Sequence, residues 1–422
     1  MHDITNQTDH EIDKIEKIII ENRVITHYQP IISVTKQKIV GLESLARGVD
    51  PLNDTIISPL DMFEYAHQNG LILPLDRLCR EKGIEGFHHA YINNNDLHLF
   101  INIDACVIDM VEGSNYLLRQ VFKHNIPPEN VVIEINESKA QNIEHLVRFV
   151  NNYRKSGFLI AIDDLGVGFS NFDRISLVKP DIIKIDRSLI KGIEKSYHKQ
   201  EIFKCLVTMA NNIGAVVVAE GVETEDELNS VLEYGAHLIQ GYFFSEPRLL
   251  SDGLMNSLEI KISNTALDFK NYLNSKMDKE RIYHRTIDTF LCNLMTKLEN
   301  ITPSEYDDLF IKCVNRHRDL NIECAYILDE HGIQVSDTLF CNDNRNHRQR
   351  LMFYPAVKGV DHSLKKYYYK LMNSREVKYL SNPYVSHATG NICITATRVF
   401  KRTNNKTYIL CVDFIHNQSG QG

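Results

Sequence analysis

Eight short runs rich in β-branched residues recur between residues 24 and 244, and most of the gaps between them carry helical patterns. The runs cover residues 24–34, 38–46, 97–104, 131–138, 158–164, 181–186, 215–221 and 237–244. Eight strands that alternate with helices over about 250 residues are the signature of a (β/α)₈ barrel. This alternation constrains the fold more than any other feature of the chain.

The first gap departs from the alternation. Only residues 35–37 separate the first run from the second, whereas a parallel crossover needs about a dozen residues or more. The first two strands should therefore be antiparallel neighbours. We predict an α/β fold whose first part is a modified TIM (β/α)₈ barrel with one antiparallel strand.

A different pattern begins after residue 250. Residues 251–300 are polar with helical periodicity. Strand, turn and strand are predicted over 324–337, a helix over 365–373, and two further strands over 391–400 and 407–415. We predict a smaller α+β domain with an antiparallel sheet. The expected organisation is a barrel domain over 1–250, a helical linker over 251–300 and the second domain over 301–422.

The bulk composition limits the location and the partners. The formal net charge is -8, so no general basic surface is expected to bind a nucleic acid polymer. The nine cysteines are scattered without a CxxC pair, which favours reduced cytosolic thiols over a disulfide framework. The N-terminal segment does not resemble a signal peptide, and no apolar run is long enough to cross a bilayer. We expect a soluble cytoplasmic protein that does not bind membranes.

Polar side chains occupy the C-terminal ends of the predicted strands. They are Glu43, Asn102, Glu134, Asp163, Asp164, Lys184, Glu220 and Gln240. In a barrel these ends converge on one face, which is the face where active sites lie. Five carboxylates around one mouth repel each other. Divalent cations relieve that repulsion, because carboxylate and amide oxygens are ligands suited to Mg²⁺, Mn²⁺ or Ca²⁺.

The adjacent carboxylates Asp163 and Asp164 could serve two ions. Two ions about 3.5–4 Å apart are the usual clamp for in-line attack on a phosphodiester. Lys184 could orient the attacking water or meet developing negative charge. The residues therefore indicate a two-metal phosphoesterase, although a barrel metalloenzyme acting on a sugar acid or an enolate would use similar ligands. Any one position also fits a structural role, such as an ion pair or a turn; the whole set on one face does not.

Specific motifs accompany these residues in a fixed order. They are "YQPI" at 28–31, "GLESLAR" at 41–47, "INID" at 101–104, "IEINES" at 133–138, "IDDLGVGFSN" at 162–171, "KPDIIKIDRSLI" at 179–190, "VAEGVETEDEL" at 218–228 and "QGYFFSEP" at 240–247. In these motifs the chain resembles the EAL family of cyclic di-GMP phosphodiesterases. The resemblance implies a modified barrel with one antiparallel strand. It also implies hydrolysis of cyclic di-GMP to linear pGpG with two Mg²⁺ or Mn²⁺ ions.

The resemblance also assigns roles to individual residues. It implies that the first metal is held by Glu43, Asn102, Glu134 and Asp163, and the second region by Asp163, Asp164 and Glu220. The catalytic set that it implies is Lys184, which positions water, with Glu220, Gln240, which helps to hold the hydrated metal site, and Glu137, which anchors a loop. The implied substrate-side or supporting residues are Gln29, Arg47, Asp186 and Glu223. Arg47 is the preferred candidate for a phosphate contact, because its planar fork suits phosphate oxygens.

Three positions depart from the family pattern. Ser44 replaces the usual Ala of the signature triplet, and strand alternation should point it away from the face of Glu43. Leu165 stands where the family usually has Phe, and Val167 where Thr or Ala is common. Both lie in a loop that couples the active site to the dimer interface in this family. A receptor that binds cyclic di-GMP without turnover is therefore a second hypothesis, although no matched ligand is missing.

The C-terminal part resembles the Cache-type sensor domains, which are PAS-like. The resemblance rests on "ILDEHGIQVSD", "DHSLKKYYYKLMN" and "NPYVSHATGNICITATRVF". It implies an unknown small ligand, while a dimerisation module with tyrosines in its core is the alternative. We expect a homodimer from the family resemblance. A third hypothesis is that this domain is a scaffold and the barrel acts through protein contacts.

Overall fold

The computed structural model describes residues 14–108, 110, 114–136, 142–166, 172–314, 320–340, 354–374, 376–386, 388–402 and 405–416. The chain divides into two compact units, Met1–Leu273 and Asn274–Gln421. The division falls inside one long helix, α11, which runs from Asp252 to Leu298. In the described part of the chain, no helix combines the length and the hydropathy needed to span a membrane.

The first unit is a closed barrel of eight strands with one short extra strand. The barrel strands are β1 (Val24–Ser33), β2 (Lys38–Val49), β4 (His98–Ile103), β5 (Val131–Asn136), β6 (Leu159–Leu165), β7 (Ile182–Ile185), β8 (Val216–Ala219) and β9 (Leu238–Ile239), and β3 (Ile56–Ile57) pairs with β2. The order is β1-β9-β8-β7-β6-β5-β4-β2, and pairing of β1 with β2 closes it. Strand β1 is antiparallel to both neighbours, and the other pairs of barrel strands are parallel. The prediction of one antiparallel strand is confirmed.

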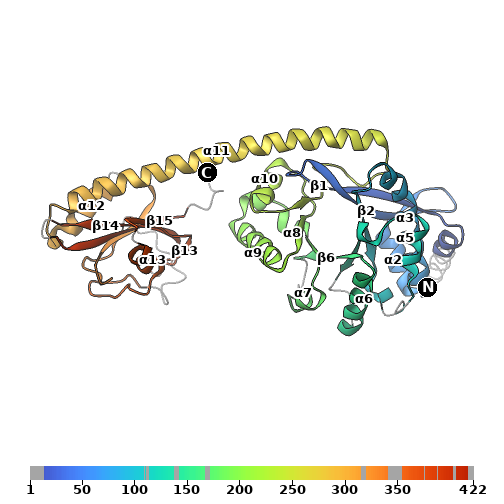
Figure 1. Ribbon diagram of the computed structural model, residues 1–422, viewed down its shortest axis with the longest axis horizontal. Helices are drawn as coiled ribbons and strands as arrows, with labels where there is room; N and C mark the ends of the chain where they lie inside the picture. Colours follow the sequence, from blue (N-terminus) through green and yellow to red (C-terminus); the bar gives the residue numbers. More distant parts are fainter. Residues whose placement is uncertain are drawn as a thin grey trace, which may run out of the picture. The chain divides into compact units, whose positions relative to one another are not determined.

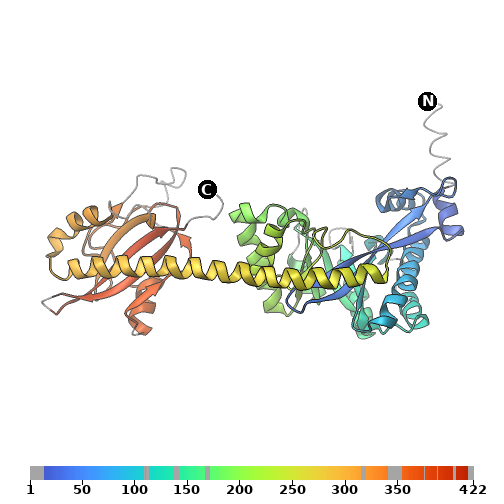
Figure 2. The ribbon, with the colours of Figure 1, turned by 90° about the horizontal axis from the view of Figure 1, so that it is seen from above.

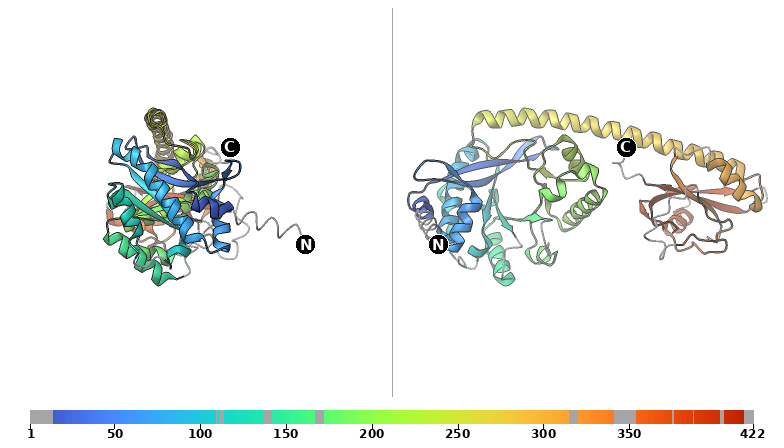
Figure 3. Two further views of the ribbon diagram at one scale, coloured as in Figure 1. Left: turned by 90° about the vertical axis from the view of Figure 1, so that its right-hand side faces the viewer. Right: turned by 180° about the vertical axis from the view of Figure 1, so that it is seen from behind.

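Helices surround this barrel (Figures 1 and 3). Besides a helix over residues 14–20 and the first part of α11, the first unit holds α2 (Pro59–Gln68), α3 (Ile72–Asn93), α4 (Ala105–Ile108), α5 (Tyr116–Lys123), α6 (Ile143–Lys155), α7 (Phe172–Val178), α8 (Arg187–Ile190), α9 (Tyr197–Ile213) and α10 (Glu225–Glu233). Local sequence sets several helix starts. Ser58 caps α2 ahead of Pro59, and Thr224 and Glu227 form a capping box at α10.

Two clusters of buried apolar side chains stabilise the barrel. A large buried cluster lies between the strands and the surrounding helices. A smaller cluster, formed by alternate strand residues such as Ile31, Phe100, Val132 and Val218, fills the barrel interior. Because the interior is filled by side chains, the polar residues that follow at the C-terminal strand ends lie at the mouth of the barrel.

The last strand of the barrel is much shorter than the predicted run over 237–244. Strand β9 holds only Leu238 and Ile239, and a turn follows. Gly241 explains the early end, since a Cβ at this position would lie 2.1 Å from the carbonyl oxygen of Val222. The chain passes so close to its neighbour here that only glycine fits, and this close approach places Gln240 at the barrel mouth.

The second unit is a smaller domain built on an antiparallel sheet (Figure 2). Its strands are β10 (Ile322–Asp329), β11 (Leu339–Phe340), β12 (Lys378–Leu380), β13 (Tyr384–Val385), β14 (Ile392–Lys401) and β15 (Thr407–Ile415). The order is β11-β10-β15-β14-β12, with β13 paired to β14. The predicted strand after the turn at Gly332 is not formed. It contributes two isolated bridges, Gln334 with Leu328 and Ile333 with Asp361.

Helices cover both faces of this sheet. Residues 287–298 of α11 and helix α12 (Tyr306–Val314) share one apolar cluster with one face. Helix α13 (Lys366–Ser374) packs through Tyr367 and Leu371 on the other face, together with Tyr326 and Cys411. The predicted modified barrel followed by a smaller α+β domain is therefore confirmed.

Candidate active site

One buried lysine lies at the centre of the barrel mouth. Lys184, on β7, is 1% exposed. Its Nζ contacts the carboxylates of Glu134 at 2.6 Å, Glu220 at 2.7 Å, Glu43 at 3.0 Å and Asp163 at 3.4 Å. These acids come from four different strands or strand ends. The barrel therefore gathers one cation and four of the predicted carboxylates in a single cluster.

Amide side chains hold the same carboxylates in place. The Nδ2 of Asn102 donates to Oε1 of Glu43 and to Oε2 of Glu134, at 3.0 Å each. The Nε2 of Gln240 donates to Oε2 of Glu43 at 2.6 Å and to Oε1 of Gln29 at 3.0 Å. Glu43 therefore has three protein partners, Lys184, Asn102 and Gln240, that compensate its position within an apolar strand.

Asp164 extends the cluster on one side. Oxygen atoms of Asp163, Asp164 and Glu220 lie within 4.8 Å of one another. Asp164 has a φ of 57°, in the left-handed region that Asp tolerates better than most residues. This backbone turn lets two adjacent carboxylates face one site. Asn136, which sequence reasoning missed, donates to Oδ2 of Asp164. The signal was available, because Asn136 follows Glu134 by two residues on the same face of β5.

Burial and charge shift the ionisation of this cluster. Burial raises the pKa of Glu134 well above its usual range, and Glu43 raises it further. Burial likewise raises the pKa of Glu220, to about 8. Burial alone would raise the pKa of Glu43, but Lys184, Gln240 and Asn102 together lower it. Burial opposes the charge of Lys184, yet its carboxylate neighbours raise its pKa well above the ordinary value. Lys184 is therefore an ammonium group.

The cluster fits divalent cations in charge and in donor chemistry. Five acidic side chains face one ammonium group, so the cluster has more acidic groups than basic ones. The buried Oε1 of Gln240 has no hydrogen-bond partner in the described part of the chain. Hard oxygen donors that lack a full set of partners are what Mg²⁺ and similar ions bind.

The other predicted site residues are less closely tied to the cluster. Arg47 donates to the carbonyl oxygen of Ala46 at 2.8 Å. Asp186 caps helix α8 by accepting from the backbone N–H of Ser188 at 2.7 Å. Glu223 pairs with Arg187 at 2.5 Å, and this arginine was not predicted. The roles of Arg47, Asp186 and Glu223 toward a substrate stay predictions.

Two further predicted positions, Glu137 and Val167, fall outside the described residues.

Two of the departures from the family pattern can be placed. Ser44 donates to the carbonyl oxygen of Phe100 at 3.2 Å and lies against Gly83 of helix α3. Its side chain is thus on the helix-facing side of β2, as strand alternation indicated. Leu165 is 1% exposed and belongs to the main barrel core.

The closed barrel and its acidic mouth define a known class of proteins. The model of the EAL domain family matches residues 12–247. This match covers more than half of the chain, and the chain belongs to the EAL domain family.

Individual relatives cover different shares of the chain. The uncharacterized EAL-domain containing protein YkuI of Bacillus subtilis is 26% identical over 395 residues, which are 91% of this chain and 93% of YkuI. The probable cyclic di-GMP phosphodiesterase PdeB of Escherichia coli is 31% identical over 230 residues, 54% of this chain but only 43% of PdeB.

The same fold is seen in a solved structure. The crystal structure of YkuI in complex with substrate c-di-GMP and calcium covers 96% of this chain and 99% of that chain. It superposes with a TM-score of 0.74 at 24% identity. At this level of identity the similarity extends to the fold of both units and not to their ligands.

Proposed function

We propose that the protein is a metal-dependent phosphodiesterase that hydrolyses cyclic di-GMP to linear pGpG. The observation that carries the proposal is the contact of Lys184 with four carboxylates inside a family barrel. The name of PdeB, a probable cyclic di-GMP phosphodiesterase, supports the substrate.

The cluster offers two groups of residues that would hold divalent cations. The first comprises Glu43, Asn102, Glu134 and Asp163, and the second comprises Asp163, Asp164 and Glu220. Bound cations would place positive charge against the phosphoryl oxygens and make a water molecule more acidic. The number of acids supports two ions, either Mg²⁺ or Mn²⁺.

The chain itself would supply orientation and positive charge. Lys184 is an ammonium group in contact with Glu43, Glu134, Asp163 and Glu220, so it fixes their spacing and would place positive charge near the reacting phosphodiester. Gln240 and Asn102 hold Glu43 in one orientation, which keeps the mouth organised before the substrate arrives. Gln29 on β1 and Arg47 on β2 are the proposed substrate contacts.

The division of labour between the parts of the chain is a further proposal. We assign hydrolysis to residues 1–250, a linker role to 251–300 and regulation to 301–422, with a homodimer as the active form. Light scattering of the purified protein would test the oligomeric state. Hydrolysis by a fragment that ends in α11 would test whether the second unit is needed for activity.

The decisive assay follows pGpG by chromatography in protein incubated with cyclic di-GMP and either Mg²⁺ or Mn²⁺. We expect product to rise with time and to vanish with a chelator. Asp163→Asn and Glu43→Ala should abolish turnover. Asp96→Asn, which alters a carboxylate that is 74% exposed, should not.

Two outcomes would count against the proposal. Tight binding of cyclic di-GMP without pGpG would make the protein a receptor instead. Hydrolysis that persists in both Asp163→Asn and Glu43→Ala would remove the assigned roles from the cluster.

A further inference from the structure

Helix α11 packs on the barrel through its first part. Within the first unit, which ends at Leu273, the buried side chains of Leu258 and Ile262 belong to the main barrel cluster. Lys261 directly precedes Ile262 and is exposed. Lysines on the surface of a helix are ordinarily solvated, so the contacts of Lys261 decide whether it has a further role.

The ammonium group of Lys261 contacts the chain that follows strand β9. Its Nζ donates to the carbonyl oxygen of Phe243. It also lies 4.8 Å from the centre of the Phe243 ring and 5.8 Å from the centre of the Phe244 ring. The two rings are in edge-to-face contact, with centroids 5.0 Å apart. A cation held by a carbonyl and by two aromatic rings is more than a solvated charge, because each contact restricts where it lies.

The residues that Lys261 contacts belong to a segment that reaches the barrel mouth. We call residues 240–245 the Gln240 segment. At its start, Gln240 is 4% exposed and donates to Oε2 of Glu43 at 2.6 Å. At its end, the carbonyl oxygen of Ser245 accepts from Nε2 of Gln29 at 3.2 Å. Gln29 also accepts from Gln240 at 3.0 Å. The position of the segment therefore sets the position of side chains at the mouth.

Backbone hydrogen bonds tie the same segment to the chain that follows strand β8. The N–H of Gln240 donates to the carbonyl oxygen of Ala219 at 2.9 Å, and the carbonyl oxygen of Gln240 accepts from Val222 at 3.2 Å. The N–H of Phe243 donates to the carbonyl oxygen of Val222 at 2.9 Å. The carbonyl group of Phe243 is held separately, by Lys261. A change at Lys261 therefore releases one carbonyl group without removing these backbone bonds.

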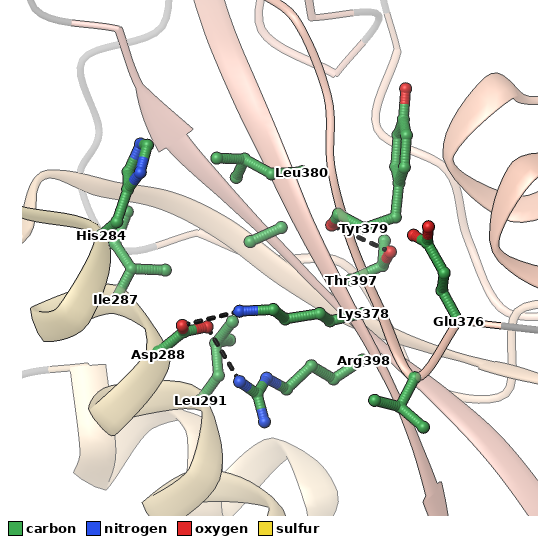
Figure 4. Close-up of a pocket in the computed structure, with 12 residues that line it drawn as sticks. His284, Ile287, Asp288, Leu291, Glu376, Lys378, Tyr379, Leu380, Thr397 and Arg398 are labelled. Atoms are coloured by element: carbon green, nitrogen blue, oxygen red, sulfur yellow. Dashed lines mark hydrogen bonds and ion pairs between the residues drawn. The ribbon is translucent and has the colours of Figure 1, made fainter. Parts of the chain in front are cut away.

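In the second unit, the same helix uses charge in a different way. Asp288, on α11, lies between Lys378 and Arg398 (Figure 4), at 2.8 Å from each. These ion pairs join α11 to the sheet of the second unit, and neither cation belongs to the site proposed at the barrel mouth. Asp288 thus offers a control in which α11 loses a charged contact that does not involve the Gln240 segment.

We propose that Lys261 is a positioning residue for the hydrolysis proposed above. By holding the carbonyl group of Phe243 it fixes the Gln240 segment, and with it the amide of Gln240 that orients Glu43. Lys261 acts through this segment and not on the substrate. The inference rests on the proposed function, since Glu43 is one of the proposed metal ligands. Without the ammonium group, Glu43 should be less well oriented to hold a cation.

Hydrogen exchange of the full-length protein, followed by mass spectrometry, tests the position of the segment without any need for turnover. The backbone N–H groups of Gln240, Phe243, Phe244 and Ser245 all donate hydrogen bonds. Their exchange therefore reports how firmly the segment is held.

The variants separate the charge of Lys261 from its bulk. Lys261→Met keeps much of the side-chain length and removes the ammonium group, whereas Lys261→Arg keeps a cation that can donate to a carbonyl. Two controls accompany them. Lys270→Met removes another exposed lysine of α11, and Asp288→Asn weakens the contact in the second unit. We expect exchange of the segment to become at least about threefold faster in Lys261→Met and to stay unchanged in both controls.

Hydrolysis of cyclic di-GMP is then measured at a series of Mn²⁺ concentrations. In Lys261→Met we expect kcat to fall at least about threefold and the Mn²⁺ concentration for half-maximal rate to rise. A general loss of folded protein would instead lower the rate at every Mn²⁺ concentration alike. Lys261→Arg should regain most of the lost protection and rate, and Lys270→Met should match the unaltered protein.

Three results would overturn the proposal. They are unchanged exchange of the segment in Lys261→Met, faster exchange without loss of rate in a protein that hydrolyses cyclic di-GMP, and equal losses in Lys261→Met and Lys261→Arg. If the unaltered protein does not hydrolyse cyclic di-GMP, the proposed function fails, and the exchange measurement still decides whether Lys261 holds the segment.

Discussion

Replacing Lys184 tests whether protein charge, rather than metal alone, holds the barrel mouth together. Lys184→Met keeps much of the side-chain volume and removes the ammonium group that Glu43, Glu134, Asp163 and Glu220 share. Removing one partner of a buried ion pair typically costs about 3–5 kcal/mol, because the remaining charge is left uncompensated. For a unit of this size that loss lowers the melting temperature by roughly 6–20 °C.

The assay is thermal unfolding in the presence of a chelator. The control is Lys195→Met, which removes a lysine whose side chain is 80% exposed and should leave the melting temperature unchanged. Two conditions should reduce the loss in Lys184→Met. Added Mg²⁺ would replace the missing positive charge, and a lower pH would protonate the carboxylates, two of which already have raised pKa values.

This reasoning would be refuted if, in the presence of chelator, the Lys184→Met protein had the same melting temperature as the unaltered protein. It would mean that the carboxylates are stabilised by their amide partners or by protonation. Loss of stability that neither Mg²⁺ nor low pH restores would point instead to a packing defect. Turnover should be lost in either case, so activity alone does not separate these explanations.

Three further predictions concern single positions. Gly241→Ala should lower hydrolysis at least tenfold, since its Cβ would meet the Val222 carbonyl and displace Gln240, while Gly253→Ala, where no atom lies within 4 Å, is the control. Ser44→Ala should cost about 0.5–1.5 kcal/mol of stability, from the lost bond to a backbone carbonyl, and leave turnover unchanged; an altered turnover would contradict its placement on the helix side. Burial raises the pKa of Asp413 to about 7 in the folded state. The folded protein therefore keeps a proton that the unfolded chain releases near pH 4, and stability of the second unit should fall by up to about 1.4 kcal/mol per pH unit between about pH 4 and 7. Melting of Asp413→Asn against pH would show a smaller fall, and parallel curves would contradict the shift.

The strand pattern predicted the barrel because its physical basis is local. Each parallel strand is a short apolar run that ends in a polar residue, and a three-residue gap leaves no room for a crossover. The length of β9 could not be predicted in this way. The predicted run over 237–244 continues past Ile239, but the approach of Gly241 to Val222 is a contact between separate segments. The strand predicted after Gly332 fails for the same reason. The hydrophobic pattern does not show whether a segment pairs with a neighbouring strand along its length or, like Gln334, only through an isolated bridge.

The candidate site shows the same limit at the level of single side chains. Its members were predictable, because strand ends converge on one face. Their partners were not. Asp186, predicted as a substrate-side or supporting residue, caps a helix, a role that needs only the N–H of Ser188 two residues away; its role toward a substrate stays a prediction.

Glu43 shows why the pairing matters for mechanism. Sequence reasoning explained this buried acid by a bound cation, whereas the structure gives it Lys184, Asn102 and Gln240, residues 59 to 197 positions away. A carboxylate with three protein partners is held in place before any metal arrives, so the mouth is organised in advance. A divalent cation bound by these acids, as proposed above, would compete with Lys184 for the same oxygens. The affinity for divalent cations should therefore be set by this lysine as well as by the acids, and a variant that lacks its charge should bind Mg²⁺ more tightly while losing turnover.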